Sequence, residues 1–243
     1  MMPHQDTTAL PDGAQARTAP ESAGMALPAA VLFDMDGTLV DTERLWWDAV
    51  ETVARNLGRT LGPEDRPDVV GRPSQHTAAY LASTTATLPS ASALAARLDE
   101  TFTALVAQEV VPRPGALQLL HLLAGQGIPA AIVSASPHRV VELVRERLGR
   151  ELFTLIVAFE DTTVSKPAPD PYLEAARRLG AQPGECVVVE DSPVGLAAAE
   201  AAGCPVVVVP STVPIDAAPG RTIITSLEEV TLPLLAQARG SER

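Results

Sequence analysis

The stretch from Ala30 to Glu43, AVLFDMDGTLVDTE in one-letter code, constrains the fold of this chain more than any other. Its apolar start is typical of a parallel strand that is buried on both faces. Asp34 ends this run and Asp36 follows two residues later, so both carboxylates face the same side of an extended chain. Ligands of open parallel sheets bind beyond the carboxyl ends of the strands. The stretch therefore predicts an α/β fold with two acids at the end of its first strand.

After residue 112 the chain alternates between helical and strand patterns. Such alternation is typical of a parallel sheet with helices on both faces. The residues expected in strands are 30–34, 130–133, 155–158, 186–190 and 206–209, with a short edge strand at 223–224. The residues expected in helices are 116–124, 139–148, 171–179 and 194–202, and a last helix is expected to start near Leu227.

Between Leu45 and Val111 the sequence shows no strand pattern. Helices are expected over residues 45–57, 74–82 and 91–106. An all-helical unit, residues 45–111, thus interrupts the α/β core directly after its first strand, and the core is expected to comprise residues 26–44 and 112–243. Residues 1–25 are rich in Pro, Ala, Gly and Thr without apolar periodicity, so we expect them to form a disordered tail.

The composition limits the partners of the chain. A net charge of -12 at pH 7 argues against a nucleic-acid partner and against an anionic membrane surface. A small anionic substrate stays compatible with it, because local cations and a metal ion can outweigh the overall field. Cys186 and Cys204 stand in apolar surroundings without metal-ligand spacing, which indicates a reduced, cytoplasmic protein. No apolar run reaches the length that spans a bilayer.

Hydroxyls and one lysine follow two further strands. Ser134-Ala135-Ser136 comes directly before Pro137, at the expected start of a helix, where such groups either bind an anion or cap the helix. Lys166 is the one lysine among 18 Lys and Arg residues, and the prolines around it stiffen its loop. An ammonium held in this way suits a phosphate group, although a lone lysine more often lies on the surface.

Two adjacent acids, Glu190 and Asp191, end and follow the strand at 186–190. Carboxylates at this edge of the sheet, across from those of the first strand, are the ligands that Mg²⁺ prefers. The alternative is that Asp191 or Ser192 caps the next helix. Acids, a hydroxyl and an ammonium at the ends of four successive strands can together hold Mg²⁺, a phosphoryl group and a nucleophile.

With this set of residues the chain resembles the haloacid dehalogenase-like (HAD) superfamily. The four motifs of that family are matched in order by residues 34–38 (DMDGT), Ser134, Lys166 in Lys-Pro-Ala-Pro-Asp, and Glu190-Asp191. The resemblance covers residues 30 to about 225 and implies a Rossmann-like three-layer α/β core. The helical unit resembles the family's cap. One position departs from the pattern, because Ser165 stands where the family often has Gly before its lysine.

The resemblance also implies a mechanism. Asp34 would attack phosphorus and form an aspartyl-phosphate, while Asp36 would give a proton to the leaving oxygen and later take one from water. The expected ligands of Mg²⁺ are Asp34, the main-chain carbonyl of Asp36, Asp191, and Glu190 either directly or through water. The expected ligands of the phosphoryl oxygens are Ser134, Lys166 and nearby backbone N–H groups such as that of Ala135.

Three cap residues are candidates for contact with the rest of the substrate. Arg72 lies in a turn between Gly71 and Pro73, Trp46 opens the first cap helix, and His76 follows in a later helix. Each has a structural alternative. An arginine can lie on the surface, a histidine can be partly exposed on a helix, and a tryptophan can pack in the core.

These residues predict a Mg²⁺-dependent phosphatase of a small phosphorylated metabolite, such as a sugar phosphate or phosphoglycolate, and a monomer is the simplest assumption. The alternative is a sugar-phosphate mutase of the β-phosphoglucomutase type. Such mutases draw a His and a Lys from the cap, but this cap has no lysine and Trp46 stands at the place of the histidine. Phosphonate hydrolysis would also need a cap lysine, dehalogenases lack the counterpart of Asp36, and a non-catalytic scaffold is disfavoured because no catalytic position is lost.

Overall fold

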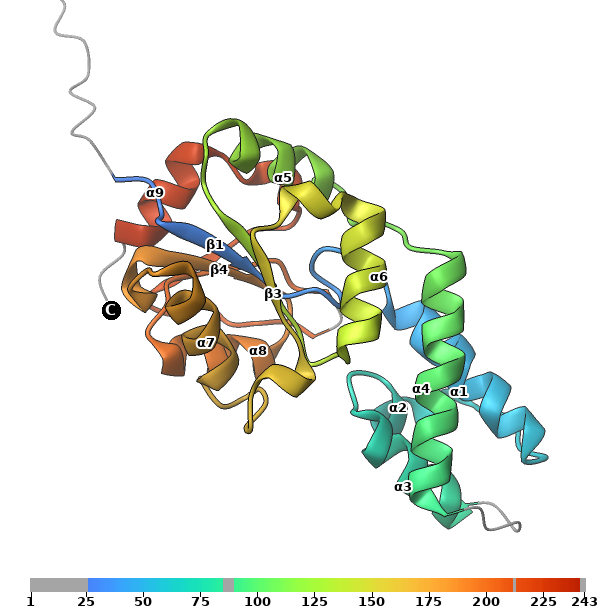
Figure 1. The fold of residues 1–243 in the computed structure, drawn as a ribbon. Helices are drawn as coiled ribbons and strands as arrows, with labels where there is room; N and C mark the ends of the chain where they lie inside the picture. The colour runs from blue at the N-terminus through green and yellow to red at the C-terminus, as the bar shows by residue number, and fades with distance from the viewer. Residues whose placement is uncertain (1–25, 85–89, 212, 241–243) are drawn as a thin grey trace, which may run out of the picture.

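The computed structural model describes residues 26–84, 90–211 and 213–240. These residues form an α/β core and a helical cap (Figure 1). The expected disordered tail, residues 1–25, lies outside the described residues. The core is built on one six-stranded sheet in which every neighbouring pair of strands is parallel, in the order β3-β2-β1-β4-β5-β6. The strands are β1 (Ala30–Phe33), β2 (Ala130–Val133), β3 (Leu155–Val157), β4 (Cys186–Glu190), β5 (Val206–Val208) and β6 (Arg221–Ile223).

Helices cover both faces of the sheet, as expected for a three-layer α/β core. Successive residues of β1 point to opposite faces, so Val31 and Phe33 enter one hydrophobic cluster while Ala30 and Leu32 enter another. The first cluster packs against α5, α6 and α9, and the second against α7 and α8. The core helices are α5 (Ala116–Gly125), α6 (His138–Leu148), α7 (Asp170–Leu179), α8 (Pro193–Ala202) and α9 (Leu232–Gly240).

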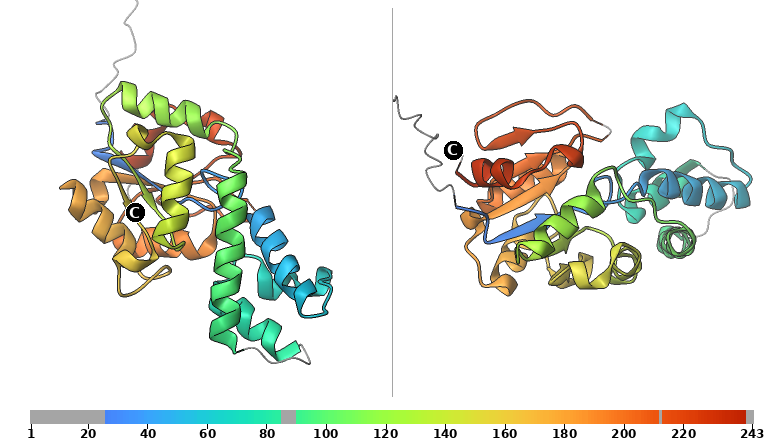
Figure 2. Two further views of the ribbon diagram at one scale, coloured as in Figure 1. Left: turned by 45° about the vertical axis from the view of Figure 1, so that its right-hand side comes forward. Right: turned by 90° about the horizontal axis from the view of Figure 1, so that it is seen from above.

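The cap follows β1 directly and lies beyond the carboxyl ends of the strands (Figure 2). Its helices are α1 (Glu43–Asn56), α2 (Arg66–Val69), α3 (Ser74–Thr84) and α4 (Ala91–Gln108). It has its own hydrophobic cluster, which includes Val53, Leu81 and Leu98. The parts of α1 and α4 that lie nearest the sheet pack against the core, because Leu45 and Phe102 belong to the first cluster. The division of the chain at residues 44/45 and 111/112 stays a prediction.

The expected elements are present to within a few residues, with one larger difference near the end of the chain, and α2 has no expected counterpart. The expected last helix is present but starts later than Leu227: residues Leu227–Glu229 form a single 3-10 turn, and α9 begins at Leu232. Ser226 caps this turn, and the buried side chain of Leu227 anchors it against the core. The short strand expected at 223–224 is shifted, since β6 ends at Ile223.

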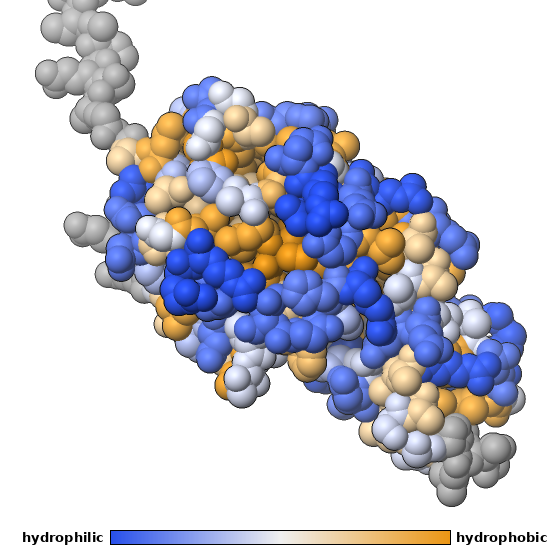
Figure 3. Space-filling view, viewed as in Figure 1, coloured by the Kyte–Doolittle hydropathy of each residue, from blue (hydrophilic) through white to orange (hydrophobic). Residues whose placement is uncertain are grey.

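The hydropathy of the surface is shown for one face of the molecule in Figure 3. On the face drawn in Figure 3, polar residues cover most of the surface, and apolar residues gather where Figure 1 draws β3. β3 is an edge of the sheet, so one side of it is not covered by another strand. None of the helices in the described ranges has the length and hydropathy that crossing a bilayer requires.

Candidate active site

The sheet order brings the expected functional residues together. β1 lies between β2 and β4, so the segments that follow these three strands are neighbours at one edge of the sheet. Asp34 follows β1, Ser134 follows β2, and Glu190 ends β4. The loop before α7 adds Lys166, whose side chain is only 5% exposed. The alternative that this lysine lies on the surface is therefore wrong.

Asp34 is a buried carboxylate with one engaged oxygen and one free oxygen. Lys166 Nζ donates to its Oδ1 at 2.8 Å. Its Oδ2 is buried and has no hydrogen-bond partner among the described residues. Burial raises the pKa of Asp34 well above its usual range, and the charge of Glu190 raises it further, although Lys166 opposes this. Lys166 is thus shared between two buried carboxyl groups, Asp34 and Glu190, which explains why the charged form of Asp34 is disfavoured.

Glu190 is completely buried, and its carboxylate accepts five hydrogen bonds. Oε1 accepts from Lys166 Nζ and from the hydroxyl of Tyr172, both at 2.8 Å. Oε2 accepts from the backbone N–H groups of Asp191 and Ser192 and from the Ser192 hydroxyl. A Cβ at Gly195 would stand only 1.5 Å from Oε1, so this glycine makes room for the carboxylate. Both oxygens of Glu190 are thus already occupied by donors of the protein.

Asp36 is held by three hydroxyl groups. Oδ1 accepts from Thr42 Oγ1 at 2.6 Å, and Oδ2 accepts from Ser134 Oγ at 3.0 Å and Ser136 Oγ at 2.9 Å. Thr42 precedes α1 but makes no side-chain cap to this helix. The hydroxyl of Thr42 thus links the residue just before α1 to the carboxylate of Asp36 in the core.

Asp191 completes the acidic cluster. Its Oδ2 accepts a hydrogen bond from the hydroxyl of Ser211, which lies after β5. A Cβ at Gly37 would stand 2.1 Å from the same oxygen, so the glycine that turns the chain after Asp36 also admits this carboxylate. The helix α8 is capped by Ser192 and not by Asp191. Asp191 is therefore left for the cluster.

The cluster fits a divalent cation. Asp34, Glu190 and Asp191 each offer an oxygen within 4.8 Å of the others. Oδ2 of Asp34 is buried without a hydrogen-bond donor among the described residues, and a metal ion bound here would satisfy this oxygen. Because both oxygens of Glu190 are engaged, Asp34 and Asp191 are the better candidates for direct ligands, with Glu190 beside them. The carboxylate of Asp36 is engaged by hydroxyls, which leaves its main-chain carbonyl as its expected contribution.

The electrostatics of this cluster predict how stability depends on pH and Mg²⁺. Burial raises the pKa of Asp191 from 3.8 to about 6; the Ser211 hydrogen bond lowers it and Glu190 raises it. A raised folded-state pKa means that the stabilising effect of the protonated group is complete below about pH 4 and is lost as the pH rises through about 6. Mg²⁺ is expected to reverse that loss, because it binds the ionised form.

Differential scanning fluorimetry tests this expectation. Mg²⁺ should raise the melting temperature more at about pH 7.5 than at about pH 5. In Asp191→Asn the difference between the two pH values should shrink. An equal shift at both pH values in the wild-type protein would contradict the assignment of Asp191 to the metal site.

The three cap candidates meet at a short helix that the sequence did not predict. Trp46 Nε1 donates to the carbonyl of Val69 at 2.8 Å, and Arg72 Nε donates to the carbonyl of Pro67 at 2.9 Å. His76 Nε2 lies 2.9 Å from Oδ1 of Asp68. All three partners belong to α2. No described contact joins these three side chains to the acidic cluster, and their role toward a substrate stays a proposal.

Sequence reasoning assigned no site role to Thr42, Tyr172 and Ser211, and it did not predict the contact of Ser136 with Asp36. Ser136 had a signal, since it stands two residues after Ser134 at the same strand end. Tyr172 resembles an ordinary buried aromatic residue of an amphipathic helix, so nothing in the sequence marked its hydroxyl. Ala135 lies in the same segment, and the expected hydrogen bond from its backbone N–H to a phosphoryl oxygen stays a prediction.

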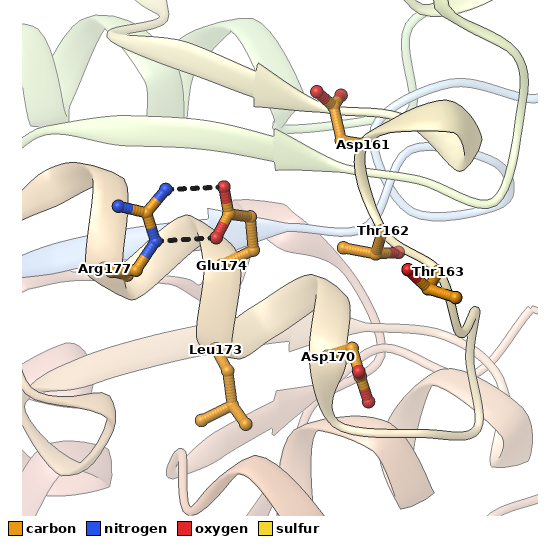
Figure 4. A pocket seen from close by; sticks show the side chains of 7 residues that line it. All are labelled: Asp161, Thr162, Thr163, Asp170, Leu173, Glu174 and Arg177. Carbon is orange, nitrogen blue, oxygen red and sulfur yellow. Dashed lines mark hydrogen bonds and ion pairs between the residues drawn. The ribbon is translucent and has the colours of Figure 1, made fainter.

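A surface pocket of about 300 Å³ lies elsewhere on the core, beside α7 (Figure 4). Its lining residues are Asp161, Thr162, Thr163, Asp170, Leu173, Glu174 and Arg177. Glu174 is paired with Arg177, and Asp161 with Arg178. Because Glu174 and Asp161 are already paired with arginines and none of the lining residues belongs to the buried acidic cluster, the pocket carries no catalytic assignment.

The fold and this site define an enzyme of a known class. A sequence profile of the haloacid dehalogenase-like hydrolases matches residues 28–203. The chain is 36% identical over 187 residues to "Probable pseudouridine-5'-phosphatase" of Drosophila melanogaster, covering 74% of this chain and 80% of that protein. It is 33% identical over 185 residues to hexitol phosphatase B of Escherichia coli, covering 75% and 83%. The chain therefore belongs to the haloacid dehalogenase-like hydrolase family.

A solved structure supports the same assignment. The crystal structure of CbbY from Rhodobacter sphaeroides in complex with phosphate superposes with a TM-score of 0.73 and 29% sequence identity, covering 84% of this chain and 96% of that chain. The expected family, its α/β core and its inserted helical cap are thus confirmed.

Proposed function

We propose that the chain is a Mg²⁺-dependent phosphatase that hydrolyses a small phosphorylated metabolite through a phosphorylated Asp34. The observation that carries this proposal is that two neighbouring carboxylates have different hydrogen-bond partners. Asp34 is paired with an ammonium and keeps one buried oxygen without a donor. Asp36 is held by three hydroxyls on the other side of the site. Neighbouring carboxylates in such different surroundings are typical of a nucleophile beside an acid and base.

In the first step, a carboxylate oxygen of Asp34 attacks phosphorus, and the bond from phosphorus to the ester oxygen breaks. Asp36, in its protonated form, gives its proton to that leaving oxygen. Lys166 would donate to a phosphoryl oxygen, and the hydroxyl of Ser134 would turn from Asp36 to donate to another, which holds the phosphoryl group in line for the attack. Asp34, Asp191 and the carbonyl of Asp36 would hold Mg²⁺, which would neutralise negative charge on the phosphoryl group.

In the second step, water attacks the phosphorus of the aspartyl-phosphate. Asp36 is now ionised and takes a proton from this water. The bond between phosphorus and the oxygen of Asp34 breaks, which releases inorganic phosphate and restores the carboxylate. The hydrogen bond from Thr42 links Asp36 to the residue that opens the cap, so the position of the cap and the orientation of this acid are expected to be coupled.

The relatives support a small phosphate ester as the substrate, because their names refer to a nucleoside phosphate and to hexitol phosphates. Phosphate release from a panel of sugar, polyol and nucleoside phosphates and phosphoglycolate tests this class. Hydrolysis by the wild-type chain in the presence of Mg²⁺, and none with EDTA, is the expected result. No release from any member of the panel would contradict the proposal.

A mutase would be recognised in the same screen, because it converts a sugar 1-phosphate into its 6-phosphate isomer without releasing phosphate. The composition of the chain opposes that outcome. Its one lysine, Lys166, lies in the core, so the cap supplies no ammonium. Formation of glucose 6-phosphate from β-glucose 1-phosphate with a bisphosphate primer would favour the mutase.

The contact between Ser211 and Asp191 predicts a defect in metal binding. Ser211→Ala removes the donor that orients this carboxylate, and partners of metal ligands typically contribute about tenfold or more to metal affinity. We expect Mg²⁺ to bind about tenfold more weakly, as measured by isothermal titration calorimetry without substrate. Ser226→Ala, a serine outside the cluster that caps the turn at Leu227, serves as the control and should bind Mg²⁺ normally.

A further inference from the structure

Tyr172 is a completely buried tyrosine whose polar end reaches the phosphoryl site. It lies on α7, and its ring packs in the hydrophobic cluster formed by β1, β4 and α8. Its hydroxyl donates to Oε1 of Glu190 at 2.8 Å. The ammonium of Lys166 lies 4.8 Å from the centre of its ring. A phenylalanine would fill the same space, so packing alone does not account for the hydroxyl.

The hydroxyl acts as a donor, because its partner is a carboxylate oxygen that already receives a hydrogen bond from Lys166. The acceptor, Oε1 of Glu190, is the same oxygen that receives a hydrogen bond from Lys166. Two donors thus share one carboxylate oxygen, at equal distances of 2.8 Å.

We propose that Tyr172 is a positioning residue of the phosphoryl site: by sharing Oε1 of Glu190, its hydroxyl keeps the ammonium of Lys166 available to Asp34 and to a phosphoryl oxygen. This inference rests on the proposed phosphatase function. It assigns Tyr172 an effect through Lys166, without contact between the tyrosine and the substrate.

The surroundings of Glu190 explain why Lys166 is the group that responds. Oε2 is fixed by two backbone N–H groups and the Ser192 hydroxyl, and the carboxylate fills the space that a Cβ at Gly195 would take. A rotation of the carboxylate toward another donor would break these three hydrogen bonds. If the tyrosine hydroxyl is lost, the charge of Oε1 is compensated by Lys166 alone. The ammonium is then drawn toward Glu190 and away from Asp34, which lies at 2.8 Å on its other side.

The lysine also has a limited number of donors to share. An ammonium carries three N–H groups. Asp34 and Glu190 accept two of them, and the face of the Tyr172 ring shields the ammonium from the hydrophobic cluster. One donor then remains for a phosphoryl oxygen. A tighter ion pair between Lys166 and Glu190 would turn this donor away from the phosphoryl oxygen. Loss of the Tyr172 hydroxyl should therefore weaken the binding of phosphate.

Tyr172→Phe tests the proposal, because it keeps the ring under Lys166 and removes only the hydroxyl. With p-nitrophenyl phosphate and Mg²⁺, we expect kcat/KM to fall about tenfold, the size typical of a hydrogen bond to a charged group. The inhibition constant of inorganic phosphate should rise by a similar factor. Ser192→Ala is the matched control. It removes one hydroxyl from the other oxygen of Glu190 together with the cap of α8, but Oε2 keeps two backbone donors, and the effect on kcat/KM should be smaller.

A double-mutant cycle distinguishes an effect through Lys166 from general loosening of the core. In a Lys166→Met background, adding Tyr172→Phe should change neither kcat/KM nor the affinity for inorganic phosphate any further. The same loss in both backgrounds, or full activity of Tyr172→Phe in the wild-type background, would overturn the assignment while the phosphatase function stands. A wild-type chain without activity on p-nitrophenyl phosphate and on the metabolite panel would overturn both.

Discussion

Asp34→Asn is expected to lower kcat for phosphate monoester hydrolysis by roughly 10⁴-fold or more, the scale typical of removing a nucleophile that acts with a set of partners. Asparagine has the same size and can still accept a hydrogen bond from Lys166 at the Oδ1 position. It has no charge to direct at phosphorus and is a poor ligand for Mg²⁺. Steady-state phosphate release with an accepted substrate of the panel measures the effect.

The fold of this variant should be intact, and its melting temperature without Mg²⁺ should be at least that of the wild-type protein. Burial and the neighbouring acids raise the pKa of Asp34, so removal of its charge relieves repulsion in the cluster. Asp41→Asn is the matched control, since it makes the same change at an exposed acid outside the cluster and should keep full activity. Substantial Mg²⁺-dependent activity in Asp34→Asn would contradict the assignment of the nucleophile.

Asp36→Asn is expected to lower kcat by about 10³-fold, within the range of general acid and base catalysis. The three hydroxyls around this side chain can still bond to an amide, so its position should be kept. The variant can neither protonate the leaving oxygen nor activate water. The loss in the first step should be smaller for an aryl phosphate than for an alkyl phosphate, because a phenolate leaves more easily without a proton.

Pre-steady-state kinetics with both substrate types measure this difference. A phosphorylated enzyme should accumulate with the aryl phosphate, since its hydrolysis lacks a base. Ser136→Ala removes one hydroxyl from Asp36 and leaves the acid in place, so its loss should be about tenfold or less. An equal loss for both leaving groups, together with no accumulation, would argue that Asp36 carries no proton in the reaction.

The α/β core could be predicted from the sequence because its strands are short apolar runs that end in polar residues. Asp34, Ser134 and Glu190 each follow or end such a run, and parallel strands bring these ends to one edge. Lys166 was recognisable as the single lysine in a proline-stiffened loop. The burial of Lys166 could not be predicted from the sequence. It depends on two carboxylates, one directly after β1 and one at the end of β4, that lie far away in the sequence.

The partners of these residues were harder to predict. Ser211 lies in a loop after β5 whose path the sequence does not determine, and Tyr172 has the helical spacing of an ordinary core residue. In the cap, α2 is only four residues long and contains Pro67, so it has no periodicity to detect. For that reason the interactions of Trp46, Arg72 and His76 with α2 could not be predicted from the sequence.

Direct detection of the phosphorylated nucleophile tests the proposed mechanism most directly. The Asp36→Asn variant is incubated with an accepted aryl phosphate and Mg²⁺, quenched in acid, digested and analysed by mass spectrometry. The expected result is one added phosphoryl group on the peptide that contains Asp34, and none when Asp34 is also changed to Asn. An unmodified Asp34 in a variant that still releases the phenol, or a phosphoryl group on another residue, would contradict the assignment of Asp34 as the nucleophile.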